Sequence, residues 1–118
     1  MTSKELAYKA AEILDNKKGE DIVIIEVAEK SSFADYLVIA TGRSGRQVAA
    51  LTDDVEDGLE KEGAICKGIE GKGGTGWVLL DMGDIIVNVF ERETRDKYNI
   101  EKVWGDCPVI NYEGTPEE

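Results

Sequence analysis

The segment from Trp77 to Phe90, WVLLDMGDIIVNVF, constrains the fold most, because it holds two apolar runs joined at Gly83-Asp84. A glycine at the first central position of a two-residue loop is typical of a type II′ turn, so the pattern predicts an antiparallel hairpin. Cross-strand partners then share a face of the sheet. One face pairs Met82 with Ile85, Leu80 with Val87 and Val78 with Val89; the other pairs Asp81 with Ile86, Leu79 with Asn88 and Trp77 with Phe90.

The two faces of this hairpin predict different roles. The first is aliphatic throughout, so we expect Val78, Leu80, Val87 and Val89 to lie in the core. The second is apolar and aromatic but carries two polar side chains, which a sealed interior would have to pair. Aromatic side chains often anchor protein interfaces, although a place in the core is their commoner fate. We therefore expect four residues to face outward toward a partner: Trp77, Asp81, Asn88 and Phe90.

Charge narrows the class of partner. The chain has 118 residues, which fits one domain, and its 25 acidic against 14 basic residues give a formal net charge of -11. Such a surface is repelled by a phosphate backbone, so direct nucleic-acid binding is disfavoured. A basic protein partner is favoured, because complementary charge speeds encounter. The alternative explanation is that the acidity provides only solubility.

Two absences limit the chemistry. The chain has no histidine, the commonest general base and metal ligand, and its two cysteines, Cys66 and Cys107, are far apart. We expect free thiols, no metal and no cofactor. The sequence has no apolar run near the roughly 20 residues that span a bilayer, and its first residues lack an apolar signal core. These features predict a cytoplasmic protein.

The remaining pattern predicts a single α/β domain with a five-stranded mixed sheet and flanking helices. Thr2 and Glu5 fit a capping box for a helix over residues 2–17, and Ser44 with Gln47 fits another for the second helix. The expected strands are residues 21–28, 35–42 and 64–69 and the two runs of the hairpin. Short helical turns follow over 91–104. Two substantial helices cannot cover both sheet faces, so one face should stay partly open. We place the domain at residues 1–106 and an acidic C-terminal tail at 107–118.

An enzymatic alternative rests on the turn TGRSGR, residues 41–46, between a strand and a helix start. Backbone amides there can cradle a phosphate, as in nucleotide-binding proteins and nucleotidyltransferases. The turn lacks the Walker lysine and the GxGxxG spacing. Two-metal chemistry also needs converging acids, whereas Asp53 and Asp54 are adjacent on a helix and Asp81 and Asp84 straddle a turn. A tight turn capped by Ser44 explains the pattern better, and nucleotide binding through Ser44 remains the alternative function.

From about residue 21 to 104 the chain resembles the ribosomal silencing factor family, also called Iojap-related proteins. The resemblance rests on SSFADYLVIATGRSGRQVAAL (31–51) and GIEGKGGTGWVLLDMGDIIVNVFERETRDKYNIEKVW (68–104). It implies a non-enzymatic, cytoplasmic protein of nucleotidyltransferase-like fold without the catalytic carboxylates, homodimeric when free. It also implies a translation repressor that binds one basic protein of the large ribosomal subunit (number fourteen in the universal series). Binding there blocks joining of the small subunit and lowers translation under nutrient limitation.

The resemblance further implies a binding surface for the ribosomal protein. Transferred by position, it comprises Glu70, Gly71, Trp77, Leu79, Asp81, Met82, Gly83 and Asn88. Two positions depart from the family pattern. Met82 stands where an aromatic residue is usual, and Asn88 replaces the histidine of VHVF. Asparagine keeps a donor and an acceptor but loses the pH sensitivity of histidine.

Overall fold

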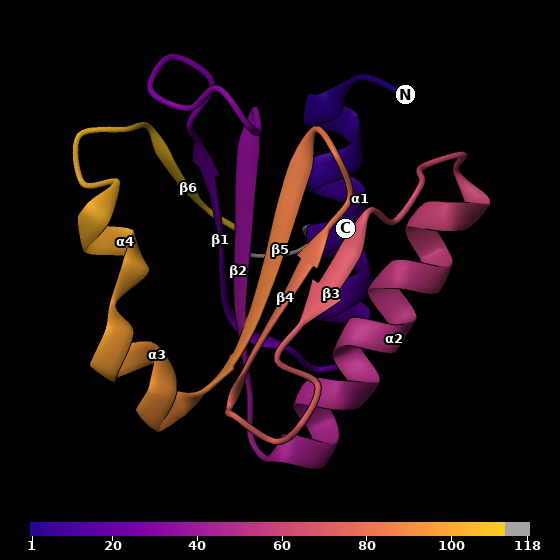
Figure 1. The fold of residues 1–118 in the computed structure, drawn as a ribbon, viewed down its shortest axis with the longest axis vertical. Coiled ribbons are helices and arrows are strands. Elements are labelled where there is room, and N and C mark those ends of the chain that lie inside the picture. Colours follow the sequence, from indigo (N-terminus) through magenta and orange to yellow (C-terminus); the bar gives the residue numbers. More distant parts are fainter. Residues whose placement is uncertain (113–118) are drawn as a thin grey trace, which may run out of the picture.

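A mixed β-sheet with the strand order β3-β4-β5-β2-β1-β6 lies between two layers of helices (Figure 1). The computed structural model describes residues 1–112, and the following bounds apply to that part of the chain. The helices are α1 (Ser3–Asn16), α2 (Gly45–Lys61), α3 (Arg92–Tyr98) and α4 (Ile100–Val103). The strands are β1 (Glu20–Glu26), β2 (Tyr36–Gly42), β3 (Gly68–Glu70), β4 (Trp77–Asp81), β5 (Ile85–Glu91) and β6 (Val109–Asn111).

The β4–β5 hairpin has the predicted register. Its partners run from Trp77 opposite Phe90 to Asp81 opposite Ile86, and the Met82 N–H donates to the Ile85 carbonyl at 3.0 Å. Gly83 has a φ of 88°, the positive value that the first central position of a type II′ turn requires. The local pattern of turn glycine and alternating side chains therefore determined this pairing.

The two long helices begin where the sequence predicts. The Thr2 side chain accepts from the Glu5 N–H, and the Glu5 carboxylate accepts from the Thr2 N–H, which completes the capping box of α1. Ser44 caps α2 by accepting from the Gln47 N–H at 3.2 Å. The Gln47 side chain accepts from the Arg43 N–H rather than from the cap residue itself, so the second capping box is only half formed.

The sheet is mixed, as expected, because β2 and β5 run parallel while the other neighbours are antiparallel. The connection through α2 carries the chain past β5 and β4 to β3 at the sheet edge. That edge strand is shorter than the predicted strand at 64–69. Its register starts at Gly68 opposite Asp81, and beyond Asp81 the partner chain enters the hairpin turn. Lys67 still donates its N–H to the Asp81 carbonyl at 2.7 Å, and residues 64–66 precede the ladder.

The prediction of five strands was wrong. Val109, Ile110 and Asn111 form β6, which pairs antiparallel with Ile25, Ile24 and Val23 of β1. This strand lies in the segment expected as a loose tail, beyond the boundary proposed at residue 106. Its pairing depends on a strand more than eighty positions earlier in the chain, a contact that local sequence does not encode. Residues 113–118, the acidic end of that tail, lie outside the described part of the chain.

Each face of the sheet has its own apolar core. The α1–α2 side contains the aliphatic hairpin residues, including Val78, Leu80, Val87 and Val89, as predicted. The opposite side contains Ile25, Leu37, Ile86 and Phe90, with α3 and α4 along it (Figure 1). The outward placement expected for Phe90 was wrong, because its side chain is fully buried in this second core.

Candidate functional site

The sheet face beneath α3 and α4 carries a row of side chains from three neighbouring strands. Glu70 lies opposite Leu79, and Leu79 lies opposite Asn88, so the three share one face. Asp81 shares that face with Ile86 in the next row. The structure therefore brings together five predicted site residues: Glu70, Trp77, Leu79, Asp81 and Asn88.

A shallow surface, here called the apolar hollow, lies between this sheet face and α4. Its lining residues are Phe33, Leu37, Trp77, Leu79, Ile86, Asn88, Ile100, Val103 and Trp104. Its volume is about 180 Å³, below the roughly 300 Å³ at which cofactor and small-molecule pockets begin. The hollow therefore suits the side chains of a protein partner better than a cofactor.

Aromatic rings form much of the hollow. The Trp77 ring stacks on the Phe90 ring with 4.9 Å between ring centroids. The Trp77 ring also contacts the tilted Tyr98 ring, with 5.1 Å between ring centroids. Phe33 meets Trp104 edge-on at 6.2 Å. Phe33 is 57% exposed and Val103 71% exposed, which is unfavourable for large apolar side chains in water. Both side chains line the hollow, which leaves apolar surface in contact with solvent there.

Asn88 has an internal role that differs from the expected one. Its side chain is 2% exposed, and its Oδ1 accepts a hydrogen bond from the Trp77 indole Nε1 at 3.0 Å. Asn88 therefore does not face outward as predicted. The amide pairs with the indole within the protein, which resolves the problem of a polar group on an apolar face.

Asp81 is half-buried, and its Oδ1 accepts from the Gly83 N–H at 2.9 Å. This hydrogen bond stabilises the hairpin turn. Asp81 therefore stabilises the turn whatever else it contacts, and its side chain also lies on the same sheet face as the hollow.

Three predicted site residues lie away from the hollow. Met82 is 3% exposed in the core under α1 and α2, so its side chain belongs to the opposite face. Gly83 lies in the hairpin turn beside Lys67. Gly71 follows β3 with a φ of 89°, and a Cβ there would lie 2.0 Å from the Trp77 carbonyl oxygen. Gly71 thus permits a close approach of two backbones next to Trp77.

The lining of the hollow includes residues that the sequence did not predict as site residues, among them Phe33, Ile100, Val103 and Trp104. A signal for the last three was present, because apolar residues at positions i, i+3 and i+4 form one stripe of a short helix. Phe33 carried no such signal. It reaches the hollow only because the loop before β2 folds over the same sheet face.

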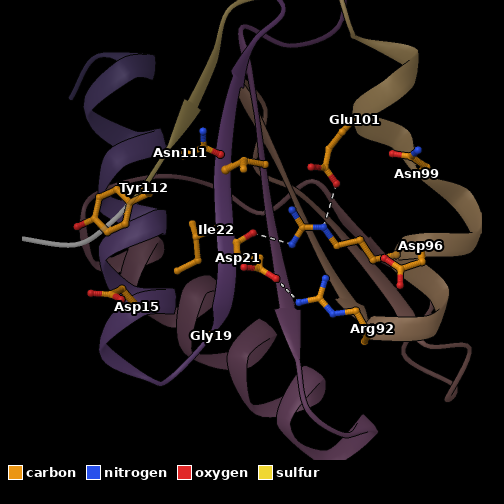
Figure 2. A pocket seen from close by; sticks show the side chains of 12 residues that line it. Asp15, Gly19, Asp21, Ile22, Arg92, Asp96, Asn99, Glu101, Asn111 and Tyr112 are labelled. Carbon is orange, nitrogen blue, oxygen red and sulfur yellow. Dashed lines mark hydrogen bonds and ion pairs between the residues drawn. The ribbon is translucent and has the colours of Figure 1, made fainter.

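A buried arginine, Arg95, connects α3 and α4 to the sheet; Figure 2 labels two of its partners, Asp21 and Glu101. Arg95 is 5% exposed; its Nη1 donates to the Asp21 carbonyl at 2.6 Å and to the Thr41 hydroxyl at 2.7 Å. Its Nε donates to a Glu101 carboxylate oxygen at 2.9 Å. We call Arg95 and these three acceptors the Arg95 clasp. Next to it, Arg92 pairs with the Asp21 carboxylate, and that hydrogen bond raises the pKa of Arg92.

The depression beside the clasp is larger than the apolar hollow, at about 650 Å³, and acidic and basic side chains line it together. Its arginines already contact Asp21, Thr41 and Glu101. These contacts explain the depression as the junction where α3 and α4 join the sheet. They do not make it an anion site.

In the turn at residues 41–46, on which the enzymatic alternative rests, polar side chains are engaged in contacts within the protein. Ser44 and Gln47 bond the backbone of the helix start, and the Arg43 Nε lies 2.8 Å from a Glu20 carboxylate oxygen. Among residues 1–112, no group of three or more acidic or cysteine side chains is placed to hold a metal ion. Within the same residues, no helix combines the length and apolarity needed to cross a membrane.

Comparisons with known proteins agree on one family. The family model described as "Ribosomal silencing factor during starvation" matches residues 1–118. The chain is 37% identical over 114 residues to ribosomal silencing factor RsfS of Halalkalibacterium halodurans, covering 97% of each chain. It is 38% identical over 111 residues to RsfS of Bacillus subtilis, covering 94% of each. A crystal structure of a Chromobacterium violaceum protein superposes with a TM-score of 0.86 at 35% identity, covering 100% of this chain and 92% of that one.

Proposed function

Because this chain belongs to the ribosomal silencing factor family, we propose that it represses translation by binding the large ribosomal subunit through the apolar hollow. The partner is the basic ribosomal protein numbered fourteen in the universal series, and the bound protein blocks joining of the small subunit. The observation that carries this proposal is the hollow itself, where exposed Phe33 and Val103 adjoin the Trp77 ring.

The charges around the hollow support a basic partner. Glu70 is exposed and Asp81 half-exposed, and both lie on the same face as Leu79. The chain as a whole carries a formal charge of -11. A protein interface typically combines a desolvated apolar centre with a polar rim. Here aromatic and aliphatic side chains line the hollow and the carboxylates of Glu70 and Asp81 lie on the same sheet face, which suits a partner that carries lysines and arginines around an apolar patch.

The arrangement of layers supports repression by steric exclusion. The hollow lies on the α3–α4 side of the sheet, whereas α1 and α2 cover the opposite side (Figure 1). A partner on the hollow therefore leaves the α1–α2 layer facing away from it. The described domain measures 35 × 31 × 30 Å, so a bound copy projects by the thickness of a small protein and keeps another large surface from approaching.

The test compares two exposed apolar residues. Val103 lines the hollow and is 71% exposed, while Ile65 lies outside it and is 75% exposed. Neither substitution to glutamate leaves a buried cavity, so both variants should fold. We expect Val103→Glu to reduce co-sedimentation with isolated large subunits at least tenfold and to restore joining of the small subunit in a light-scattering assay. Ile65→Glu should behave as the unsubstituted protein.

A second pair addresses the charged rim. Glu70→Lys places a positive charge at the rim and should weaken binding, with a smaller loss at high salt because salt screens surface charges. Asp57→Lys makes the same change on α2, on the other side of the sheet, and should leave binding unchanged. Equal binding by Val103→Glu, Glu70→Lys and their controls would overturn the proposed surface.

The family resemblance also implies a homodimer in the free state, and we propose the hollow as the contact between copies. Sedimentation velocity of Val103→Glu and Ile65→Glu tests this directly. Dissociation of the first variant alone supports a dimer through the hollow. Dimers of both variants would place the contact elsewhere.

A further inference from the structure

We propose that Arg95 is a positioning residue, which holds α3 and α4 against the sheet and so keeps the apolar hollow formed before a partner arrives. The inference rests on the proposed function in one respect only, namely that the hollow is the docking surface. The positioning itself is a property of the free protein.

Helices α3 and α4 bury few apolar side chains of their own. Arg95 is the buried residue of α3, and α4 has no buried residue. Tyr98 and Val103 are mostly exposed, and Ile100 and Trp104, which pack against the second core, are only half-buried. A segment with few buried apolar contacts opens locally at low free energy unless other contacts hold it.

The Arg95 clasp connects several elements at once, and two of its acceptor residues, Asp21 and Glu101, are labelled in Figure 2. From one side chain on α3, hydrogen bonds reach the Asp21 carbonyl on β1, the Thr41 hydroxyl on β2 and the Glu101 carboxylate on α4. A guanidinium directs its donors from several nitrogens in a fixed planar fork, whereas the three donors of an ammonium group rotate about one nitrogen. One residue therefore connects both short helices to two strands.

The link between α3 and α4 is a single residue, Asn99. Asn99 separates them with a φ of 43°, a left-handed conformation that non-glycine residues seldom adopt. Its N–H donates to the Arg95 carbonyl at 2.8 Å, so the backbone of the link also returns to Arg95. Beyond the link, Glu101 of α4 bonds the Arg95 side chain. Loss of the clasp frees α4 to pivot at Asn99, and Ile100, Val103 and Trp104 leave the hollow with it.

If the clasp holds the hollow in its binding conformation before docking, it increases the apparent affinity for the partner. When only a fraction of the free molecules has the competent conformation, the apparent dissociation constant rises by the inverse of that fraction. A clasp variant with about one molecule in ten competent should therefore bind about tenfold more weakly. The loss should appear in the association rate, because the contacts made after docking are unchanged.

The experiment uses Glu101→Gln, which keeps the shape of the side chain and removes the charge that faces Arg95, together with Arg95→Gln. Hydrogen exchange of the free protein is measured by mass spectrometry. We expect at least tenfold faster exchange over residues 92–104 in both variants, with unchanged exchange in α1, α2 and β5. Arg92→Gln is the matched control. It removes the neighbouring, more exposed pair with Asp21 and should leave exchange over 92–104 within about twofold of the original.

A double variant separates positioning by Arg95 from an independent role of Glu101. If Glu101 acts through Arg95, the Arg95→Gln/Glu101→Gln protein should exchange no faster than Arg95→Gln alone. Should Arg95→Gln fail to fold, Glu101→Gln still decides the matter against Arg92→Gln.

Two results would overturn the inference: unchanged exchange over 92–104 in Glu101→Gln, or faster exchange with an unchanged association rate for isolated large subunits. Failure of the unsubstituted protein to bind large subunits would instead reject the proposed function. The exchange data would then still decide whether Arg95 positions α3 and α4.

Discussion

The Trp77 indole Nε1 donates a hydrogen bond to the Asn88 Oδ1 at 3.0 Å across the β4–β5 hairpin. The two residues occupy neighbouring rows of the same sheet face. The Phe90 ring stacks on the Trp77 indole with a centroid separation of 4.9 Å. The hydrogen bond to Asn88 and the stacking on Phe90 together fix the orientation of the Trp77 indole. The residue at the centre of the hollow is therefore held in place by the protein and not by its partner.

Asn88→Leu tests this relationship. The substitution removes the acceptor of the indole N–H and should lower the free energy of unfolding by about 1–3 kcal/mol, the usual penalty for leaving a buried polar group unpaired. Urea unfolding gives the value, and Trp77 fluorescence should change because the ring loses its fixed orientation. Leu79→Ala is the control on the same face, since it retains the bond. A stability equal to that of the unsubstituted protein would show that the bond contributes nothing.

Gly71→Ala should be strongly destabilising. The residue has a φ of 89°, and a Cβ would lie 2.0 Å from the Trp77 carbonyl oxygen, a backbone atom that cannot move aside. We expect a loss of about 2 kcal/mol or more in the free energy of unfolding. Gly73→Ala, in the same loop, meets no atom within 4 Å and should be neutral. Similar melting temperatures for the two variants would contradict this explanation of Gly71.

The Lys30–Asp106 pair predicts a pH dependence of stability. The hydrogen bond from Lys30 lowers the pKa of Asp106 below its ordinary value, so the folded state binds the proton less readily than the unfolded state. The stabilisation is therefore fully present above the unfolded pKa of about 3.9 and disappears as the pH falls through the lower, folded value.

Urea unfolding of Asp106→Asn checks this prediction. The variant should be slightly less stable than the original protein at pH 7, and the difference should shrink as the pH falls below about 4, where the unfolded carboxyl is protonated in the original protein. The effect at pH 7 should be small because both side chains are exposed. A difference that grows on acidification would reverse the assigned sign.

Ser44→Ala distinguishes a cap from a nucleotide site. The Ser44 hydroxyl accepts from the Gln47 N–H, so its loss should lower stability by about 1 kcal/mol. We expect no saturable heat on titration of the original protein with ATP and magnesium. Binding to large subunits should be retained by the variant. Saturable ATP binding that Ser44→Ala abolishes would revive the nucleotide-binding alternative.

Much of this fold followed from local sequence. The register of β4 and β5, the core positions of Val78 and Leu80 and the caps at Thr2 and Ser44 depend on residues within a few positions of one another. In such cases the turn residues and the alternation of side chains depend on neighbours in the sequence and need no distant contact. The mixed sheet also followed, because a helix between two strands predicts a crossover.

The tertiary structure decided which side chains of the second sheet face meet solvent. Phe90 and Asn88 lie on the face opposite the aliphatic core residues, yet both are buried, because the chain folds back after β5 and places α3 and α4 along that side of the sheet. The same long-range packing brings Phe33, Val103 and Trp104 beside Trp77. Sequence alone determined that an aromatic, partly polar face exists on this hairpin. Only the packing of α3, α4 and the loop before β2 along that face determined which of its residues remain available to a partner.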